Sequence, residues 1–261
     1  MMTSTASAPT RPVGELLREW RQRRRMSQLD FATEAEISTR HLSFVETGRA
    51  QPSRDMVMRL AELLDVPLRE RNELLIAAGF APVFAARALD DPALQSARKA
   101  IDLVLKGHEP YPALAIDRHW NLVAANSMVG PFMAGASTEL LQPPVNVLRL
   151  SLHPQGMAPQ IANPLQWREH LFARLRRQIE VSADARLVAL LKELMSYPAP
   201  ARTGREDMRV NGNDVVVPLS LNTPAGTLNF ISTTTVFGTP IDVTLAELAI
   251  EAFFPADENT T

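Results

Sequence analysis

Four neighbouring residues, Thr39, Arg40, Ser43 and Phe44, have side chains suited to reading the edges of DNA bases. On a helix they would lie near its start and along one side. Arg40 could donate two parallel hydrogen bonds to O6 and N7 of a guanine, Thr39 could reach a base edge or a phosphate, and Phe44 could meet a thymine methyl. The plainer alternatives are that Arg40 contacts only phosphate and that Phe44 only packs.

A basic segment precedes these residues. Residues 11–25 hold six arginines against two acidic residues, although the whole chain has a formal net charge of −2. Such a local block can contact phosphate, and Arg23 and Arg24 are the candidates for this role. A charged helix face exposed to solvent is the alternative interpretation.

The elements that would position these side chains are short helices. Ser27 with Asp30 is a capping box, Ser38 is a second N-cap, and Gly48 stands where a helix ends in a left-handed residue. Two short helices joined by about three residues form the unit that places its second helix in a major groove. The predicted helices are Val13–Arg24, Gln28–Ala35, Thr39–Thr47, one starting at Pro52 and Ser53, and one over about Leu68–Ala78.

The pattern changes after Gly79, where a linker is followed by mixed periodicity. Helices, short apolar runs of strand length and turn residues alternate there, which predicts an antiparallel sheet with helices over one face. The predicted helices are Asp91–Lys106, two within Pro164–Tyr197, and a final one over Leu245–Phe254. The predicted strands are Ala113–Asp117, Leu122–Ala125, Val215–Leu221, Thr227–Thr234 and Thr235–Phe237.

The sequence therefore predicts an α+β protein with two domains. An all-α five-helix domain with a helix-turn-helix precedes an α+β domain with an antiparallel sheet. The expected boundaries are 1–12 for a flexible arm, 13–80 for the helical domain, 81–91 for the linker, 92–255 for the second domain and 256–261 for a polar tail.

Composition excludes several kinds of chemistry. The chain has no cysteine, which rules out disulfides and thiol nucleophiles and favours a cytoplasmic location. No apolar run approaches the roughly 20 residues that a membrane span needs. The five histidines lack metal-ligand spacing, and no catalytic or phosphate-cradling motif is present, so we expect no metal, no cofactor and no catalytic residue.

The segment Ser27–Arg49, SQLDFATEAEISTRHLSFVETGR, resembles the helix-turn-helix of the XRE/Cro/C1-type repressor family. The Ser-Gln start, Phe31-Ala32, Ile37 and the Glu46-x-Gly48 close are the shared features. This resemblance implies that Gln28 and Arg49 lie near the DNA backbone. It also implies a pair, Arg21 and Glu46, that ties the first helix to the third.

The later segments AIDRHWNLVAANSM, NVLRLSLHPQGMAPQIANPLQWREHLFARLRRQ and PLSLNTPAGTLNF resemble the MmyB-like ligand-binding domain, a PAS-like module. The resemblance implies a bacterial regulator that binds a small apolar, for example fatty-acid-like, molecule. Ordinary alternatives exist, since Trp167 could be core and Asn126 a turn former. The candidate ligand-binding residues are Asn126, His153, Asn163, Trp167 and Arg168.

These observations together predict a transcriptional regulator that binds a pseudo-palindromic, double-stranded DNA operator as a homodimer. Family habit favours a repressor over an activator. Two alternatives stay open for the second domain. It could serve only for dimerisation, or it could be an enzyme attached to a DNA-binding domain.

Overall fold

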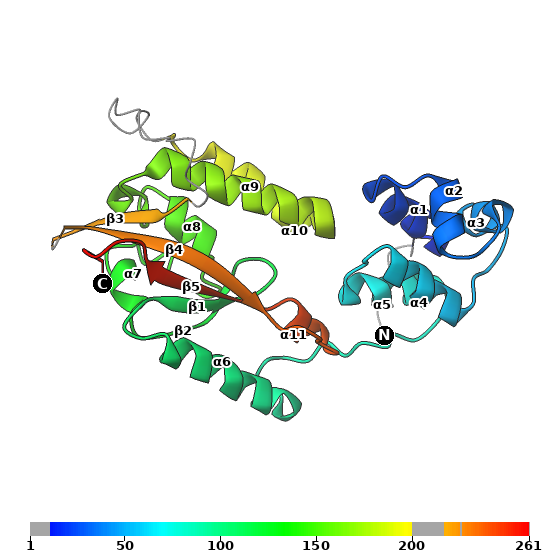
Figure 1. The fold of residues 1–261 in the computed structure, drawn as a ribbon, viewed down its shortest axis with the longest axis horizontal. Helices are drawn as coiled ribbons and strands as arrows, with labels where there is room; N and C mark the ends of the chain where they lie inside the picture. The colour runs from blue at the N-terminus through cyan, green and yellow to red at the C-terminus, as the bar shows by residue number, and fades with distance from the viewer. Residues whose placement is uncertain (1–10, 200–216, 225, 261) are drawn as a thin grey trace, which may run out of the picture. The chain divides into compact units, whose positions relative to one another are not determined.

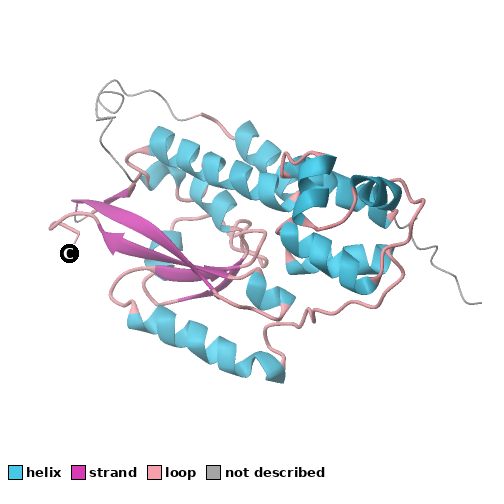
Figure 2. Cartoon of the chain, turned by 45° about the vertical axis from the view of Figure 1, so that its right-hand side comes forward, coloured by secondary structure: helices cyan, strands magenta, loops and turns pink. Residues whose placement is uncertain are grey.

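The computed structural model of the chain describes residues 11–199, 217–224 and 226–260. It divides into two compact units, Met1–Ala86 with Ile241–Val243, and Arg87–Pro240 with Thr244–Thr261. Within the described residues, no helix is both long and apolar enough to cross a membrane. All strands belong to the second unit, and the first contains helices and loops (Figure 2).

The N-terminal unit has five helices, as predicted (Figure 1). The sequence signals that start them are seen as hydrogen bonds. Ser27 and Asp30 form a complete capping box, and the hydroxyls of Ser38 and Ser53 each accept a bond from a backbone N–H in the first turn. The helices are α1 (Val13–Arg23), α2 (Gln28–Glu34), α3 (Thr39–Glu46), α4 (Arg54–Leu63) and α5 (Leu68–Ala77).

The core of this unit fixes the position of α3. Leu42 and Val45, predicted to face inward, are fully buried beside Leu17 and Phe31. A Cβ placed on Gly14 of α1 would lie 2.3 Å from the carbonyl oxygen of Val45. Only glycine allows this approach, so α1 packs directly against the backbone of α3.

The C-terminal unit holds a five-stranded antiparallel sheet in the order β2-β1-β5-β4-β3. The prediction of an α+β protein with an antiparallel sheet is confirmed. The strands are β1 (Ala113–Ile116), β2 (Leu122–Ala125), β3 (Leu219–Thr223), β4 (Gly226–Val236) and β5 (Ala249–Pro255). The helices are α6 (Gln95–Gly107), α7 (Gly130–Met133), α8 (Val147–Leu152), α9 (Pro164–Ser182), α10 (Ala185–Ser196) and α11 (Val243–Ala246), with 3₁₀ turns at Pro92–Leu94 and Ala158–Gln160.

Helices cover both faces of the sheet, so the prediction of helices over one face was wrong. Alternate residues of β1 and β5 face opposite sides because successive strand side chains do so. Ala113 and Ile250 pack against Ile101 of α6, whereas Ile116 belongs to the cluster that α8, α9 and α10 build. Figure 1 shows α6 on one side of the sheet and α9 with α10 on the other.

The predicted final helix over Leu245–Phe254 was also wrong. The structure has only the short α11 there, followed by β5 in the middle of the sheet. A central strand covered on both faces is apolar on both faces, so its sequence resembles that of a buried helix. The predicted strand Thr235–Phe237 is the end of β4, and the start of the predicted strand Val215–Leu221 lies outside the described residues.

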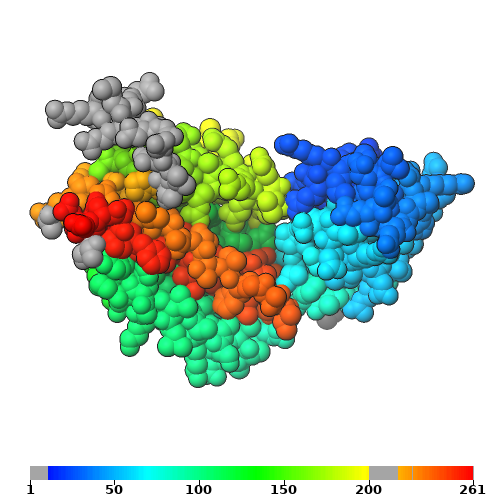
Figure 3. Space-filling view, viewed as in Figure 1, coloured from blue at the N-terminus to red at the C-terminus, as the bar shows by residue number. Residues whose placement is uncertain are grey.

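The outward half of β4 contributes to the surface of this unit. Residues 233–236 are exposed, and the orange segment in the space-filling view shows this surface (Figure 3). These residues pair with β5 on one side, whereas β3 pairs with β4 only from Gly226 to Phe230. The hydrophobic interior of the sheet therefore lies toward α6, α8, α9 and α10.

Candidate functional site

The helix α3 presents the predicted base-reading residues on its outer side. Arg40 is exposed, whereas Thr39, Ser43 and Phe44 are partly buried. The guanidinium of Arg40 lies 5.3 Å from the centroid of the Phe44 ring, and that of Arg49 lies 5.9 Å from the same centroid. Phe44 therefore organises two cations at one surface, through cation–π contacts that are individually modest.

A buried ion pair holds α3 against α1. Arg21 donates to both carboxylate oxygens of Glu46, at 2.6 and 2.9 Å, and their side chains are only 8% and 1% exposed. The hydrogen bond from Glu46 raises the pKa of Arg21, against the opposing effect of burial. The predicted Arg21–Glu46 pair is thus confirmed, and its bidentate geometry fixes the orientation of α3.

Gln28 shares the same carboxylate. Its amide nitrogen donates to Glu46 Oε2 at 2.7 Å, so the first turn of α2 is tied to the last turn of α3. The amide oxygen of Gln28 accepts no bond from the described residues. A contact between Gln28 and the DNA backbone stays a prediction.

The two candidate phosphate-binding arginines of α1 differ in their surroundings. Arg24 donates to the backbone carbonyls of Leu64 and Asp65, at 2.8 and 2.9 Å, and thereby caps the end of α4. Arg23 is exposed and lies 5.7 Å from the ring centroid of Trp20. Arg23 is therefore the arginine of this pair whose guanidinium keeps all its hydrogen-bond donors available within the described residues.

This difference predicts distinct effects of two substitutions. Arg23→Ala should reduce the slope of log affinity against log salt concentration by about one, because one phosphate contact is lost, and should leave sequence preference unchanged. Arg24→Ala should mainly lower the stability of the helical unit. Fluorescence anisotropy with an operator duplex over a salt series measures the slope. An unchanged slope for Arg23→Ala would assign this side chain to the solvent-exposed face.

The five predicted ligand-binding residues do not gather at one place. Trp167 lines the cavity described below, and the other four lie outside its wall. Asn126 is buried and joins the end of α6 to the start of β1, through bonds with the backbone of Leu105, Tyr111 and Ala113. Asn163 joins the start of α9 to β3.

The remaining two residues contact the end of α10. Arg168 donates to four backbone carbonyls there, those of residues 194, 195, 197 and 198. The ring of His153 packs edge-on against Tyr197 with centroids 4.9 Å apart. Their ligand-binding role stays a prediction, and in this structure both stabilise the packing of α8, α9 and α10.

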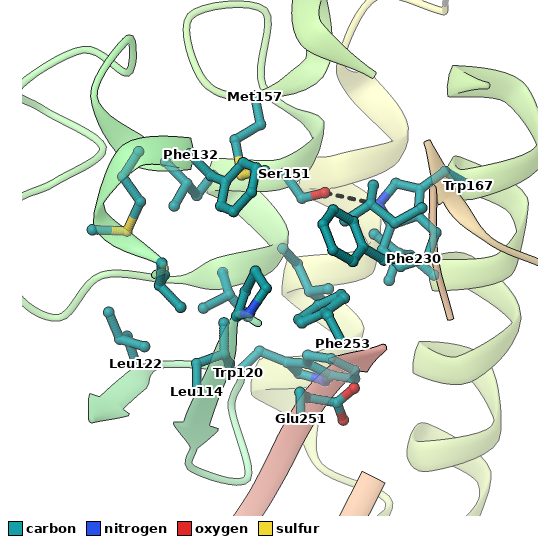
Figure 4. Close-up of a pocket in the computed structure, with 18 of the residues that line it drawn as sticks. Leu114, Trp120, Leu122, Phe132, Ser151, Met157, Trp167, Phe230, Glu251 and Phe253 are labelled. Atoms are coloured by element: carbon teal, nitrogen blue, oxygen red, sulfur yellow. Dashed lines mark hydrogen bonds between the residues drawn. The ribbon is translucent and has the colours of Figure 1, made fainter. Parts of the chain in front are cut away.

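An apolar cavity lies between the sheet and the helices α7, α8 and α9 (Figure 4). Its volume is about 90 Å³. The helix α7 supplies Phe132 and Met133, and the turn before η2 supplies Met157. The other apolar lining residues are Pro112, Leu114, Trp120, Leu122, Val129, Val147, Leu148, Leu150, Trp167, Leu171, Leu219, Leu221, Phe230 and Phe253.

Only three lining residues carry polar groups. Ser151 Oγ accepts a hydrogen bond from the indole nitrogen of Trp167 at 2.9 Å, as drawn in Figure 4. Arg174 forms two bonds with Glu251, at 2.6 and 3.0 Å, and its guanidinium lies 4.8 Å from the centroid of the Trp120 ring. Because the two charges neutralise each other, the wall of the cavity is apolar in its electrostatics as well as in its surface.

His170 lies behind this wall. Its ring stacks on Trp167 with centroids 5.3 Å apart, and its buried Nε2 finds no hydrogen-bond partner among the described residues. Burial lowers the pKa of His170, and the positive charge of Arg174 lowers it further. The imidazole is therefore neutral at pH 7 and adds no charge beside the cavity.

The turn between β1 and β2 connects the cavity wall to an ionic cluster. Trp120 has a positive φ of 66°, and its indole nitrogen donates to Gln178 of α9 at 2.7 Å. The preceding His119 bonds to Asp184 at 2.8 Å, and Arg118 contacts Asp184 and Glu247. The pKa of Asp184 is lowered, because bonds from the Arg186 N–H, His119 and Arg118 outweigh the effect of burial.

A helix-turn-helix unit with an arginine-bearing recognition helix, followed by a domain that encloses an apolar cavity, defines the class of ligand-responsive DNA-binding proteins. The comparisons agree with this class. The family model of the MmyB-like transcription regulator ligand binding domain matches residues 97–261, and that of the helix-turn-helix domain matches residues 12–74. None of the curated proteins compared with the chain matches it.

The chain belongs to the family of MmyB-like transcription regulators, since that family model covers more than half of its length. It is a DNA-binding transcription regulator with a C-terminal ligand-binding domain. Both resemblances stated from the sequence are thereby confirmed.

Proposed function

We propose that the protein binds a specific operator through α3 and that a small apolar molecule in the C-terminal cavity controls this binding. The cavity is the observation that carries the proposal, because its lining is apolar except for Ser151 and one neutralised ion pair. Ligand sites commonly combine such apolar walls with a few polar groups. Fatty-acid-like molecules are one class to test.

The size of the cavity supports a two-state mechanism. Typical ligand pockets measure roughly 300–1,000 Å³, whereas this cavity measures about 90 Å³. A ligand of ordinary size therefore binds only a widened form. Because a ligand shifts an equilibrium only by its different affinity for the two forms, widening provides the required difference.

The structure offers a wall that can move. The helix α7 has four residues, none of them buried, and it covers the cavity with Phe132 and Met133. Met157 stands beside them, and methionine side chains adapt readily to ligands of different shape. We place the widening at this wall.

Calorimetry and gel-shift assays with a panel of fatty acids and other apolar molecules test the proposal. A ligand should bind the full-length protein and should change operator affinity by about 5- to 150-fold, the usual range of allosteric coupling. Leu171→Phe, which fills the cavity from α9, should weaken the ligand without changing operator affinity in its absence. Operator affinity that does not respond to a bound ligand would instead favour a C-terminal domain that serves only for dimerisation.

We infer that the protein binds DNA as a homodimer, most simply as a repressor acting in the cytoplasm, where the operator lies. One helix-turn-helix reads one half-site, and two half-sites one helical turn apart require two recognition helices about 34 Å apart. Footprinting on the upstream region of its own gene should show two protected half-sites. Sedimentation of the complex should give two chains per operator. Turnover of a bound molecule would favour the enzyme alternative.

A further inference from the structure

The wall of the cavity holds one hydroxyl whose hydrogen-bond capacity is not exhausted. Ser151 Oγ accepts the bond from Trp167, and no acceptor for its own hydrogen exists among the described residues. A serine hydroxyl donates one hydrogen bond and accepts two. Ser151, in the last turn but one residue of α8, therefore retains a donor and a lone pair at the cavity wall.

The other polar groups of the wall lack this freedom. Glu251 accepts two bonds from Arg174 and one from Thr234, and Arg174 also bonds to Thr234 Oγ1. A charged ligand group would have to separate Arg174 from Glu251 and leave one buried charge without its partner. Because breaking a buried ion pair is costly, the pair disfavours both carboxylates and amines in this part of the cavity.

We propose that Ser151 determines ligand specificity and that the ligand is an uncharged apolar molecule with one hydrogen-bond acceptor, such as a ketone or an ester, facing Ser151. This inference rests on the proposed ligand-binding function and narrows the class of ligand. The bond from Trp167 orients the Ser151 oxygen, so its hydrogen is the donor for the ligand (Figure 4). An acceptor there completes a polar contact that would otherwise be left unmade in an apolar site.

Three probes of similar length separate the contributions: 2-octanone, the isosteric alkene 2-methyl-1-octene, and octanoate. The dissociation constant of each is measured by calorimetry with the full-length protein. We expect the ketone to bind about 2- to 10-fold more tightly than the alkene, the range that corresponds to one net hydrogen bond. Octanoate should bind more weakly than the ketone.

The variants assign this preference to the hydroxyl. Ser151→Ala should weaken the ketone and leave the alkene unchanged, whereas Ser151→Thr, which keeps a hydroxyl, should retain the preference. Because Ser151→Ala frees the indole N–H of Trp167 as a substitute donor, the double variant Ser151→Ala/Trp167→Phe should abolish any remaining preference. Circular dichroism establishes that each variant folds.

The outcomes are distinguishable. Equal affinities of ketone and alkene in the wild type, or a preference that survives in the double variant, would overturn the role of Ser151 and leave ligand sensing intact. Tighter binding of octanoate than of the ketone would overturn the uncharged class. Failure of all three probes to bind would contradict the apolar ligand site itself, and with it this inference.

Discussion

Replacing Glu46 by alanine is expected to destabilise the N-terminal unit by about 3–5 kcal/mol, the usual cost of removing one partner of a buried ion pair. The substitution leaves the Arg21 guanidinium buried, with Met26 O as its one remaining partner among the described residues, and it removes the acceptor of Gln28. Native-state hydrogen exchange at the α1 and α3 amides of the full-length protein reports the free energy of opening of this unit.

An exposed ion pair in the same unit provides the matched control. Arg59 and Glu36 lie 2.7 Å apart, but their side chains are 50% and 80% exposed. Glu36→Ala should therefore cost less than about 1 kcal/mol, because water screens and replaces the interaction. Similar losses in Glu36→Ala and Glu46→Ala would contradict the buried environment of Glu46.

The double variant Arg21→Met/Glu46→Met tests the cause of the loss. It removes both charges and keeps most of the buried volume, so it should cost less than Glu46→Ala alone. A double variant as unstable as the sum of the single variants would show that the two side chains act independently. The pair would then position α3 without the strong coupling inferred from its geometry.

The helices of the N-terminal unit could be predicted from sequence because their signals are local. Ser27, Ser38 and Ser53 each cap a helix within three residues, and the apolar spacing identifies the inward side chains Leu42 and Val45. The role of Gly14 was missed. A glycine inside a predicted helix is the available signal, but its partner is the backbone of α3, more than 30 residues later.

The sheet of the second unit was harder to predict because its determinants are distant in sequence. β5 lies between β1 and β4, and Glu251 within it is neutralised by Arg174 of α9. Neither partner is near β5 in the chain, so the period of Leu245–Phe254 alone could not distinguish a helix from a buried strand. The hairpin of β1 and β2, which depends on a local turn, was placed correctly.

The cavity lining could be predicted only in part for a related reason. Sequence reasoning selected polar residues of the family-like segments as ligand anchors, yet Asn126, Asn163 and Arg168 satisfy backbone groups at the ends of helices and strands. The lining comes from apolar residues of six or more elements, which resemble core residues in any pattern. Trp167 was selected because it belongs to a helical stripe.

Replacing Arg40 by alanine is expected to weaken operator binding by about 1–3 kcal/mol and to reduce discrimination at one base pair. Arg40 is exposed at the start of α3, and its contact with the Phe44 ring directs the guanidinium outward along the recognition surface. A guanidinium held in this way loses less side-chain entropy when it forms two parallel bonds with a guanine. Fluorescence anisotropy with the operator and with single-base variants of it measures both effects.

The comparison between sequences decides what Arg40 does. If it reads a base, Arg40→Ala loses affinity for the operator, and its affinity for scrambled DNA falls much less. If it contacts only phosphate, both affinities fall equally and the salt slope decreases by about one. Arg98→Ala, which removes an exposed arginine of α6 in the other unit, is the control for a change in net charge alone and should alter neither quantity. Lys in place of Arg40 should restore phosphate binding but not base discrimination, because an ammonium cannot form the planar bidentate pair.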